Sequence, residues 1–380
     1  MKTTMEQALQ ELEQYLGEKP ERAAVQDYLR NTPLPFIACY ADELSAKDMF
    51  DYAFRYLHVL GQYNVALSVG LAMNTYISLS IACFPAQPGT PIAFLKQQFL
   101  ALVKQNRWIL AVSSFDDFIR AKDEPGHQVF CETQPDGTIR CNGVKNFQSN
   151  ISDADLLLFS GVLDNSKVGL FYTFLKQTPG ITLGDAMYPG AMADTDTRPV
   201  FFKDLVLTPF QSVPSDDGAE NVGLHTLTRV IFAVMAMAPY LGGARRALDE
   251  AAAFLRSVQV DGVTLAELDG YVTDMGRNQI QYQICMNLAE GFAHQLQSLQ
   301  LDNLAQWLTS EAPKAMAVKH HVTAVCEQLV DNARKIIGTR SLLPGHIISQ
   351  LSQQVLFAAL HPVLNAKIER ELGAAVLKQA

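Results

Sequence analysis

Residues 141–161 read CNGVKNFQSNISDADLLLFSG, and this stretch decides the fold. It contains two short segments rich in apolar and aromatic side chains, one reaching Phe147 and the other Phe159, with a polar stretch between them. Such segments are typical of β-strands joined by a turn. Residues two apart on a strand share a face, so we expect Phe147 and Ser149 to present an aromatic ring and a hydroxyl group on the same side.

The same composition extends over the residues around this stretch. WILAVSSF begins at Trp108, KVGLFYTFL at Lys167 and PVFFKDLVL at Pro199, and turn residues separate the segments. Pro135-Asp136-Gly137 is a typical hairpin turn. Short strands at this spacing predict a compact β-sandwich or barrel over residues 108–214.

The sequence on both sides of this block has the apolar spacing of α-helices. Ser45 is a plausible N-cap for a helical hairpin that continues to Ile81 and is interrupted at Gly61 and Gly70. The helical period returns after Asp217 and continues to the end. The predicted fold class is therefore α + β, and a seam between such domains is a natural place for a ligand pocket. The predicted units are a helical domain at 1–107, a central β-domain at 108–214 and a C-terminal four-helix bundle at 215–380.

The composition excludes several classes of protein. With 380 residues and 48% apolar residues, the chain can bury a large core. The net charge of -9 and the scattered Lys and Arg residues argue against nucleic-acid binding. The six cysteines form no C-x-x-C pair, so we expect them to be reduced. We also expect a cytoplasmic protein, because the start is polar and no apolar run reaches the ~18 residues that span a membrane.

Three segments resemble motifs of the acyl-CoA dehydrogenase family. Gly143, Lys145, Phe147, Asn150 and Asp155 fall in register on the family pattern inGxKxWITNxxxAdxxxvxa. GAMADTDTRPVFFKDLVLTPFQSV and APKAMAVKHHVTAVCEQLVDNARKIIGTRSLL are similar to two later patterns of the same family. The resemblance implies the acyl-CoA dehydrogenase fold and a flavin cofactor, either FAD or reduced FMN.

The same resemblance implies which residues contact the flavin. Phe147, Gln148 and Ser149 stand at the family positions that pack on the flavin and donate toward its reactive nitrogen. Ser113 and Ser114 fall where the first β-strand of the family reaches its flavin contacts.

A further family contact comes from a neighbouring subunit. Lys335, Gly338 and Thr339 lie on the turn that, in the family, reaches the adenine dinucleotide across a subunit interface. This resemblance, together with the wide apolar face of the last helical block, implies a homo-oligomer, and we expect a tetramer.

The usual catalytic carboxylate of acyl-CoA dehydrogenases is missing from both of its known places. The C-terminal Glu-Gly-Thr motif corresponds to residues 361–364, which read His-Pro-Val-Leu. A second group of the family carries the carboxylate just before an arginine, and here Thr228 precedes Arg229. General-base catalysis is worth about 10²- to 10⁴-fold, so an ordinary fatty-acyl dehydrogenase would lose most of its activity.

The C-terminus resembles a different branch, the flavin monooxygenases similar to dibenzothiophene monooxygenase. His361, Pro362, Val363, Lys367 and Gly373 match the branch pattern LHDPVdyKlrevG. In that branch the histidine lies beside the flavin as a donor, which makes His361 the candidate catalytic residue. The alternative is a helix-terminal residue that simply precedes a proline.

Three functions remain open on the sequence. A monooxygenase would use reduced flavin, supplied by a flavin reductase, on an apolar small molecule. A dehydrogenase would act on an acyl-CoA or carrier-bound acyl thioester with a relocated base, for which Glu290 is one candidate and a solvated helix face the simpler explanation. The third possibility is a flavin-less binding or scaffold protein.

Overall fold

The computed structural model describes residues 1–380 except 114–128, 165–166, 177, 214–218, 362 and 379–380. Its N-terminal part is helical, as predicted, and a short 3-10 helix (Leu34–Tyr40) joins the second and third α-helices. The α-helices are α1 (Lys2–Gly17), α2 (Arg22–Arg30), α3 (Ala46–Tyr63), α4 (Val65–Cys83) and α5 (Pro91–Asn106).

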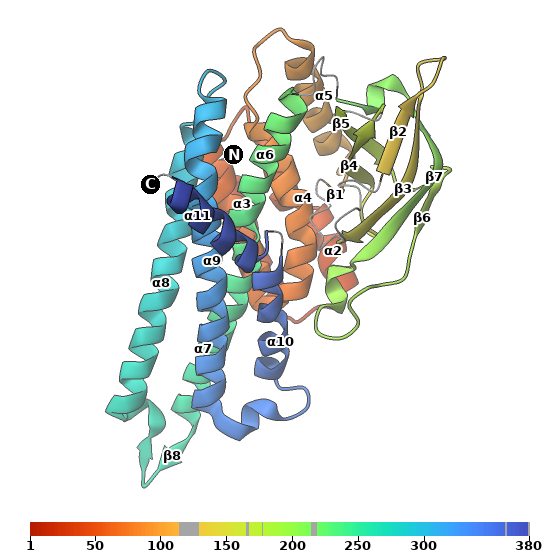
Figure 1. Cartoon of the computed structure of the whole chain (residues 1–380). Helices are drawn as coiled ribbons and strands as arrows, with labels where there is room; N and C mark the ends of the chain where they lie inside the picture. The colour runs from red at the N-terminus through yellow and green to blue at the C-terminus, as the bar shows by residue number, and fades with distance from the viewer. Residues whose placement is uncertain (114–128, 165–166, 177, 214–218, 362, 379–380) are drawn as a thin grey trace.

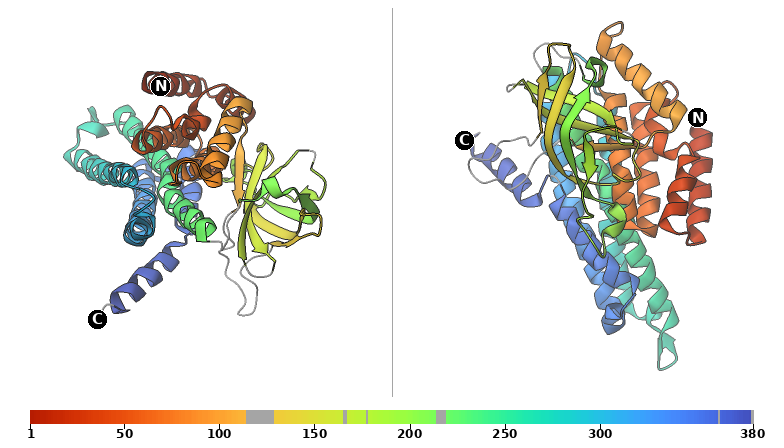
Figure 2. Two further views of the ribbon diagram at one scale, coloured as in Figure 1. Left: turned by 90° about the horizontal axis from the view of Figure 1, so that it is seen from above. Right: turned by 90° about the vertical axis from the view of Figure 1, so that its right-hand side faces the viewer.

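The middle of the chain forms a mixed sheet that lies against one side of the helices (Figures 1 and 2). Within the described residues the strand order is β1-β4-β2-β3-β7-β6, and β5 pairs with β4. The strands are β1 (Leu110–Ser113), β2 (Val129–Thr133), β3 (Ile139–Gln148), β4 (Leu156–Leu163), β5 (Lys167–Phe174), β6 (Ile181–Leu183) and β7 (Arg198–Leu207). The predicted turn at Pro135–Gly137 joins β2 to β3, and Gly137 adopts the positive φ of 83° that this turn needs.

The C-terminal part is again helical, so the predicted order of helices, β-domain and helices is confirmed. A small hairpin, β8 (Gln259–Val260) and β9 (Val263–Thr264), caps the far end of the bundle, and the last helix projects away from the body (Figures 1 and 2). The helices are α6 (Ala219–Met235), α7 (Met237–Ser257), α8 (Asp269–Gln297), α9 (Leu304–Ile337), α10 (Ile347–Leu360) and α11 (Asn365–Lys378).

The helical hairpin predicted from Ser45 exists, but it breaks at a different residue. Ser45 caps α3 in a capping box with Asp48. The break lies at Asn64, whose extended backbone ends α3 and whose side chain caps α4, whereas Gly61 lies within α3. A Cβ atom at Gly61 would lie 2.3 Å from the carbonyl oxygen of Pro239, so the glycine lets α3 and α7 approach closely.

One buried amide fixes the sheet to the helices. Asn74 on α4 is fully buried, accepts a hydrogen bond from the backbone N–H of Leu110 at 2.9 Å and donates to the carbonyl of Pro35 at 2.7 Å. Because Leu110 begins β1, this side chain sets the position of the strand that ends at Ser113. If β1 moved away from Asn74, these buried polar groups would be left without their hydrogen-bond partners, which is costly in the interior. The hydrogen bonds of Asn74 therefore hold β1 in place.

The expectation that no segment is long and apolar enough to cross a membrane is wrong. Val65–Cys83, Gly223–Ser257 and Ile347–Lys378 meet that criterion by length and composition. In the fold, however, 94% of the first window and 89% of the second are buried inside the protein, against 35% of the third. Helices that are apolar on all sides occur in the core of large proteins as well as in membranes, and the first two serve here as core.

The half-buried His58 gives the helical body a sensitivity to acid. Its Nε2 lies 2.6 Å from the hydroxyl of Tyr282, which joins α3 to α8, and burial lowers the pKa of His58 to about 4. The unfolded chain takes up this proton near pH 6.5, so between pH 6.5 and pH 4 it binds more protons than the folded chain. The free energy of unfolding therefore falls as the pH falls through this window.

We predict that His58→Gln makes stability less dependent on pH between pH 6.5 and pH 4, because Gln cannot take up a proton. Urea unfolding at several pH values measures this slope. The matched control is His294→Gln, a change at an exposed position of α8 that should keep the parental slope. Equal slopes for the His58 variant and the parent would show that His58 is not the acid-sensitive group.

Candidate functional site

A cavity of about 690 Å³ lies where the end of β3, helix α4 and the segment after α10 meet. This volume is within the range of roughly 300–1,000 Å³ that is common for cofactor and small-molecule sites. The cavity brings together Ser113, Phe147, Gln148, Ser149 and His361, which are far apart in sequence. Its other lining residues are Met73, Tyr76, Val112, Asn146, Tyr188, Met192, Thr195, Thr197, Phe232, Phe357, Leu360, Val363, Leu364 and Lys367.

The end of β3 does not follow the regular alternation that the sequence suggested. The pairing of β3 with β7 shifts between Lys145 and Gln148, and Phe147 has a positive φ of 60°. A bulge of this kind redirects side chains away from strict alternation. Asn146, Phe147, Gln148 and Ser149 consequently all line the cavity, rather than alternate residues alone.

Two buried polar atoms on the cavity wall have no hydrogen-bond partner within the described residues. They are the hydroxyl oxygen of Ser113 and the side-chain carbonyl oxygen Oε1 of Gln148, and both residues are almost fully buried. A buried polar group without a partner costs about 1–3 kcal/mol, so such groups commonly serve a ligand. Ser113 can donate to a ligand carbonyl or ring nitrogen, and Gln148 can accept from a ligand N–H.

A chain of three hydroxyl groups continues this wall. The Thr195 hydroxyl donates to the carbonyl of Met192 at 2.8 Å, so the Thr197 hydroxyl, 2.8 Å from Thr195, must donate to it. Ser149, 2.9 Å from Thr197, then donates to Thr197 in turn. Each hydroxyl has one proton, and that of Ser149 goes to Thr197. In this arrangement Ser149 offers the cavity an acceptor and not the donor that its place on the strand had suggested.

Aromatic rings form the other surfaces of the cavity. The ring of Phe147 is stacked on Tyr188 with centroids 6.1 Å apart, and Tyr188 meets Phe357 edge to face at 5.1 Å. Phe147 is 41% exposed and lines the cavity. Flat aromatic surfaces beside a few convergent polar atoms fit the isoalloxazine ring of a flavin, which has two apolar faces and one polar edge.

His361 lines the same cavity as a neutral imidazole. Burial, reinforced by the charge of Lys319, lowers the pKa of His361 to about 3. The hydroxyl of the buried Tyr240 lies 3.0 Å from Nδ1 and 3.4 Å from Nε2 of His361. Burial raises the pKa of Tyr240, so the phenol keeps its proton and can donate it to the nearer nitrogen. If Nδ1 accepts from Tyr240, the proton of the neutral imidazole is on Nε2. Nε2–H is then the hydrogen-bond donor of the ring.

The ammonium group of Lys319 holds the backbone that carries His361. Lys319 is 1% exposed and donates to the carbonyl oxygens of His361 at 3.3 Å and Val363 at 2.9 Å. It also donates to the side-chain oxygen of Asn365 at 2.8 Å. Burial lowers the pKa of Lys319 to about 7, and the three oxygens favour its charged form.

Carboxylates are missing from this cavity wall in the part of the chain that the structure describes. Thr228 is buried and donates to the carbonyl of Leu224, so it replaces the family carboxylate with a satisfied hydroxyl. Glu290 is exposed on α8 and does not line the cavity, which agrees with the solvated-face interpretation. Lys367 is the cation on the described wall.

Other predicted contact residues lie elsewhere. Lys335 is in the last turn of α9, and Gly338 and Thr339 follow in the 3-10 helix Gly338–Leu342. None of the three lines this cavity. Ser114 lies outside the described residues.

Several residues of the site carried no usable signal in the sequence. Tyr188 precedes a turn, Thr197 directly precedes β7 and Tyr240 lies in an apolar helix, where a core residue is the simpler expectation. Their roles follow from tertiary contacts alone. Lys319 lies in a segment that is similar to a family pattern, but nothing in that pattern indicates its contact with the His361 segment.

We predict that Ser113→Ala weakens flavin binding while leaving the free protein as stable as the parent or more stable. The hydroxyl has no partner among the described residues, so its removal should cost little in the free protein, whereas the complex loses one donor worth about 1–3 kcal/mol. Flavin titration and thermal unfolding measure the two effects.

The control variant for this prediction is Ser68→Ala. Ser68 is buried and donates to the carbonyl of Leu57 at 2.6 Å, away from the cavity. It should lower the unfolding temperature and leave flavin affinity unchanged. Flavin binding to Ser113→Ala at the parental affinity would show that Ser113 does not contact the cofactor.

Comparison with known proteins agrees with this architecture. The family described as acyl-CoA dehydrogenase, C-terminal domain, matches residues 226–360, and no curated protein sequence matches the chain. FMN-bound TdsC, a dibenzothiophene monooxygenase from Paenibacillus sp. A11-2, has a TM-score of 0.81 at 18% identity, over 100% of this chain and 97% of TdsC. Butyryl-CoA dehydrogenase from Megasphaera elsdenii has a TM-score of 0.80 at 17% identity, over 98% of both chains.

A third similar structure is KijD3 in complex with FMN and a dTDP-linked amino sugar. Its TM-score is 0.80 at 14% identity, over 99% of this chain and 91% of KijD3. Identities this low carry the fold and not the reaction. The family match over α6 to α10 and the shared architecture together show that the chain has the acyl-CoA dehydrogenase fold, with a C-terminal part similar to the C-terminal domain of that family.

Proposed function

We propose that this protein is a flavin-dependent monooxygenase that uses reduced flavin and molecular oxygen on an apolar small molecule. The observation that carries the proposal is His361, a neutral imidazole on the wall of the candidate flavin cavity. It stands where acyl-CoA dehydrogenases have their carboxylate, and it can donate a hydrogen bond at neutral pH but cannot act as a strong base.

Acid–base considerations favour this reaction over dehydrogenation. Removing the α-proton of an acyl thioester needs a base whose pKa lies near the working pH. A histidine with a pKa of about 3 is far too weak, and the described cavity wall contains no Asp or Glu. Oxygen transfer needs a hydrogen-bond donor close to the reacting atoms, which His361 supplies.

The residues of the cavity have complementary roles in this proposal. A bound flavin would supply the redox chemistry, and the FMN complexes of TdsC and KijD3 support a flavin in this fold. Ser113 and Gln148 would orient its polar edge through their unpartnered oxygens, and Phe147 would cover one face of its ring. Tyr240 holds the His361 ring and fixes the nitrogen that carries the proton.

We further propose that the protein acts as a homo-oligomer. Large apolar side chains are exposed on the C-terminal helices and the turn before them, among them Leu342, Leu343 and Leu360 at 58–62% exposure. This turn directly follows Gly338 and Thr339, the residues expected to reach a neighbouring flavin. A tetramer in sedimentation velocity, with flavin lost on dissociation, is the expected result.

In this proposal a flavin reductase would supply the protein with reduced flavin.

The decisive experiment is His361→Ala. We expect it to bind flavin about as well as the parent but to release hydrogen peroxide instead of oxygenated product, with coupling reduced at least about tenfold. His361→Gln keeps an N–H donor and should recover part of the coupling. Substrate oxidation, oxygen use and peroxide release are measured together, with reduced flavin supplied chemically.

His320→Ala is the matched control, because His320 pairs with the exposed Glu369 outside the cavity and should couple normally. Parental coupling in His361→Ala would end the oxygenase assignment. Bleaching of the oxidised flavin by an acyl-CoA without oxygen would establish dehydrogenation in its place.

A further inference from the structure

Two cysteines stand directly opposite each other in the middle of the sheet. Cys131 on β2 and Cys141 on β3 are register partners in an antiparallel pair of strands, which Figure 1 shows side by side. Both thiols are free, and both side chains are almost fully buried, at 1% and 0% exposure. They belong to the same hydrophobic cluster of the β-domain, so they project from the same face of the sheet.

The geometry of the strands places the two sulfur atoms within reach of a covalent bond. Residues that face each other in an antiparallel pair have Cα atoms about 4.5–5.5 Å apart. Disulfides span Cα separations of about 4.4–6.8 Å, so this range includes both kinds of opposite pair. A disulfide between Cys131 and Cys141 therefore requires little movement of either strand.

The surroundings of Cys131 leave space for its sulfur. Gly161 lies on the neighbouring strand β4, and a Cβ atom at this position would lie 3.2 Å from Sγ of Cys131. The fully buried ammonium group of Lys145 favours the thiolate of Cys131, which is the form of the sulfur that reacts. Hydrogen bonding with the Cys141 thiol and burial outweigh this charge and raise the pKa of Cys131, so the pair reacts slowly.

The chain itself also favours this pairing over the others that six cysteines allow. Ten positions separate Cys131 from Cys141, and the turn at Pro135–Gly137 joins their two strands. The other pair that lies close in the fold is Cys285 with Cys326, on the separate helices α8 and α9. A hairpin fixes the relative position of opposite residues through its backbone hydrogen bonds.

We propose that Cys131 and Cys141 form a redox-sensitive pair that closes to a cross-strand disulfide when the folded protein meets hydrogen peroxide. One sulfur gives up its proton and attacks the peroxide, which leaves a sulfenic acid on that sulfur and releases one water. The second thiol displaces the hydroxyl group, which leaves with the proton of that thiol as a second water. Two thiols are thus oxidised to one disulfide, and one peroxide is reduced to two waters.

The bond would close the β2–β3 hairpin covalently. Strand β3 continues from Cys141 to Gln148, which lines the candidate flavin cavity, so the same hairpin carries part of that wall. Hydrogen peroxide is small and uncharged and can reach a buried sulfur, whereas a bulky thiol such as glutathione cannot. Once formed, the disulfide should persist in the folded chain. This inference depends neither on a bound flavin nor on the proposed reaction.

Peptide mapping after peroxide treatment of the folded chain tests the proposal. Free thiols are alkylated in urea, and the chain is digested with trypsin without a reductant. Trypsin cleaves after Arg140, so the disulfide would join peptide 123–140 to peptide 141–145. We expect this linked species, lighter by two hydrogens than its separate peptides, to be the main disulfide product. The unfolding temperature of the oxidised chain should rise by about 2–4 °C.

Two variants and one reductant complete the design. Cys141→Ala should abolish both the linked species and the rise in unfolding temperature. Cys285→Ala removes a thiol that is equally buried but outside the β-domain, so it should retain both effects. Glutathione should leave the link intact in the folded chain, because the sulfurs are buried, and should reduce it once urea has unfolded the chain.

Alkylated thiols at both positions after the treatment would overturn the proposal. A main disulfide between Cys285 and Cys326, or the same temperature rise in Cys141→Ala as in the parent, would also overturn it. The peptide map of the parent alone identifies the bond, so the result does not depend on whether the alanine variants fold.

Discussion

The buried ammonium group of Lys319 is the contact on which the candidate site depends. It comes from the middle of α9 and holds the carbonyl oxygens of His361 and Val363, after α10, and the side-chain oxygen of Asn365 at the start of α11. Without such a cation, these oxygens would lie in the interior without their partner, at a cost of about 1–3 kcal/mol each. The segment that carries His361 is therefore fixed to the bundle. The charge of Lys319 also helps to keep the imidazole of His361 neutral.

This electrostatic arrangement differs from what proton abstraction requires. A carboxylate base needs a site that balances its charge near neutral pH. Here the nearest cation lowers the pKa of His361, the buried Tyr240 keeps its proton, and the described wall lacks Asp and Glu. All three features favour groups that donate hydrogen bonds. The cavity is accordingly better suited to polarise or hold an oxygen atom than to remove a proton from carbon.

The sequence predicted the fold and part of the candidate site, for identifiable physical reasons. Periodicity and turn residues distinguished helices from strands, and the motif around Phe147 indicated the strand end that lines the cavity. The left-handed backbone of Phe147 and the bulge beside it break the alternation on which the sequence argument relied. The contact between Tyr240 and His361 spans 121 positions in sequence, so local pattern could not reveal it. The helix Val65–Cys83 meets the length and composition of a membrane span, which no segment was expected to do, because burial within the core and burial in a membrane select the same residues.

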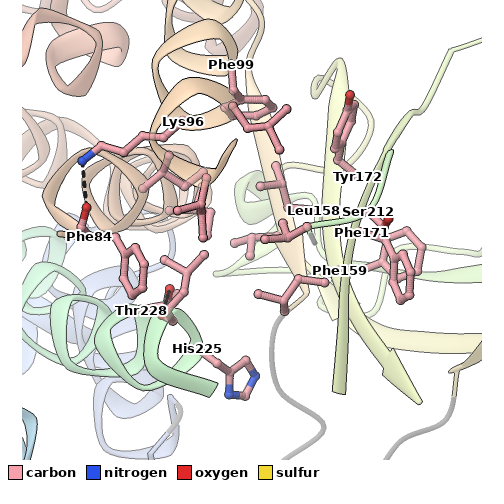
Figure 3. A pocket seen from close by; sticks show the side chains of 18 of the residues that line it. Phe84, Lys96, Phe99, Leu158, Phe159, Phe171, Tyr172, Ser212, His225 and Thr228 are labelled. Atoms are coloured by element: carbon pink, nitrogen blue, oxygen red, sulfur yellow. Dashed lines mark hydrogen bonds between the residues drawn. The ribbon is translucent and has the colours of Figure 1, made fainter. Parts of the chain in front are cut away.

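A second, smaller space lies between the helices and the sheet, and it differs from the candidate site in the groups that it presents (Figure 3). The larger cavity has two polar atoms without a partner among the described residues, together with aromatic rings. The smaller one, of about 210 Å³, is lined mainly by aromatic and aliphatic side chains. Val112 on β1 lines both, and Ser113, the next residue, lines the larger one. Since Asn74 fixes the start of β1 to α4, one buried amide helps to position the strand that the two spaces share, and a displacement of this strand would alter both at once.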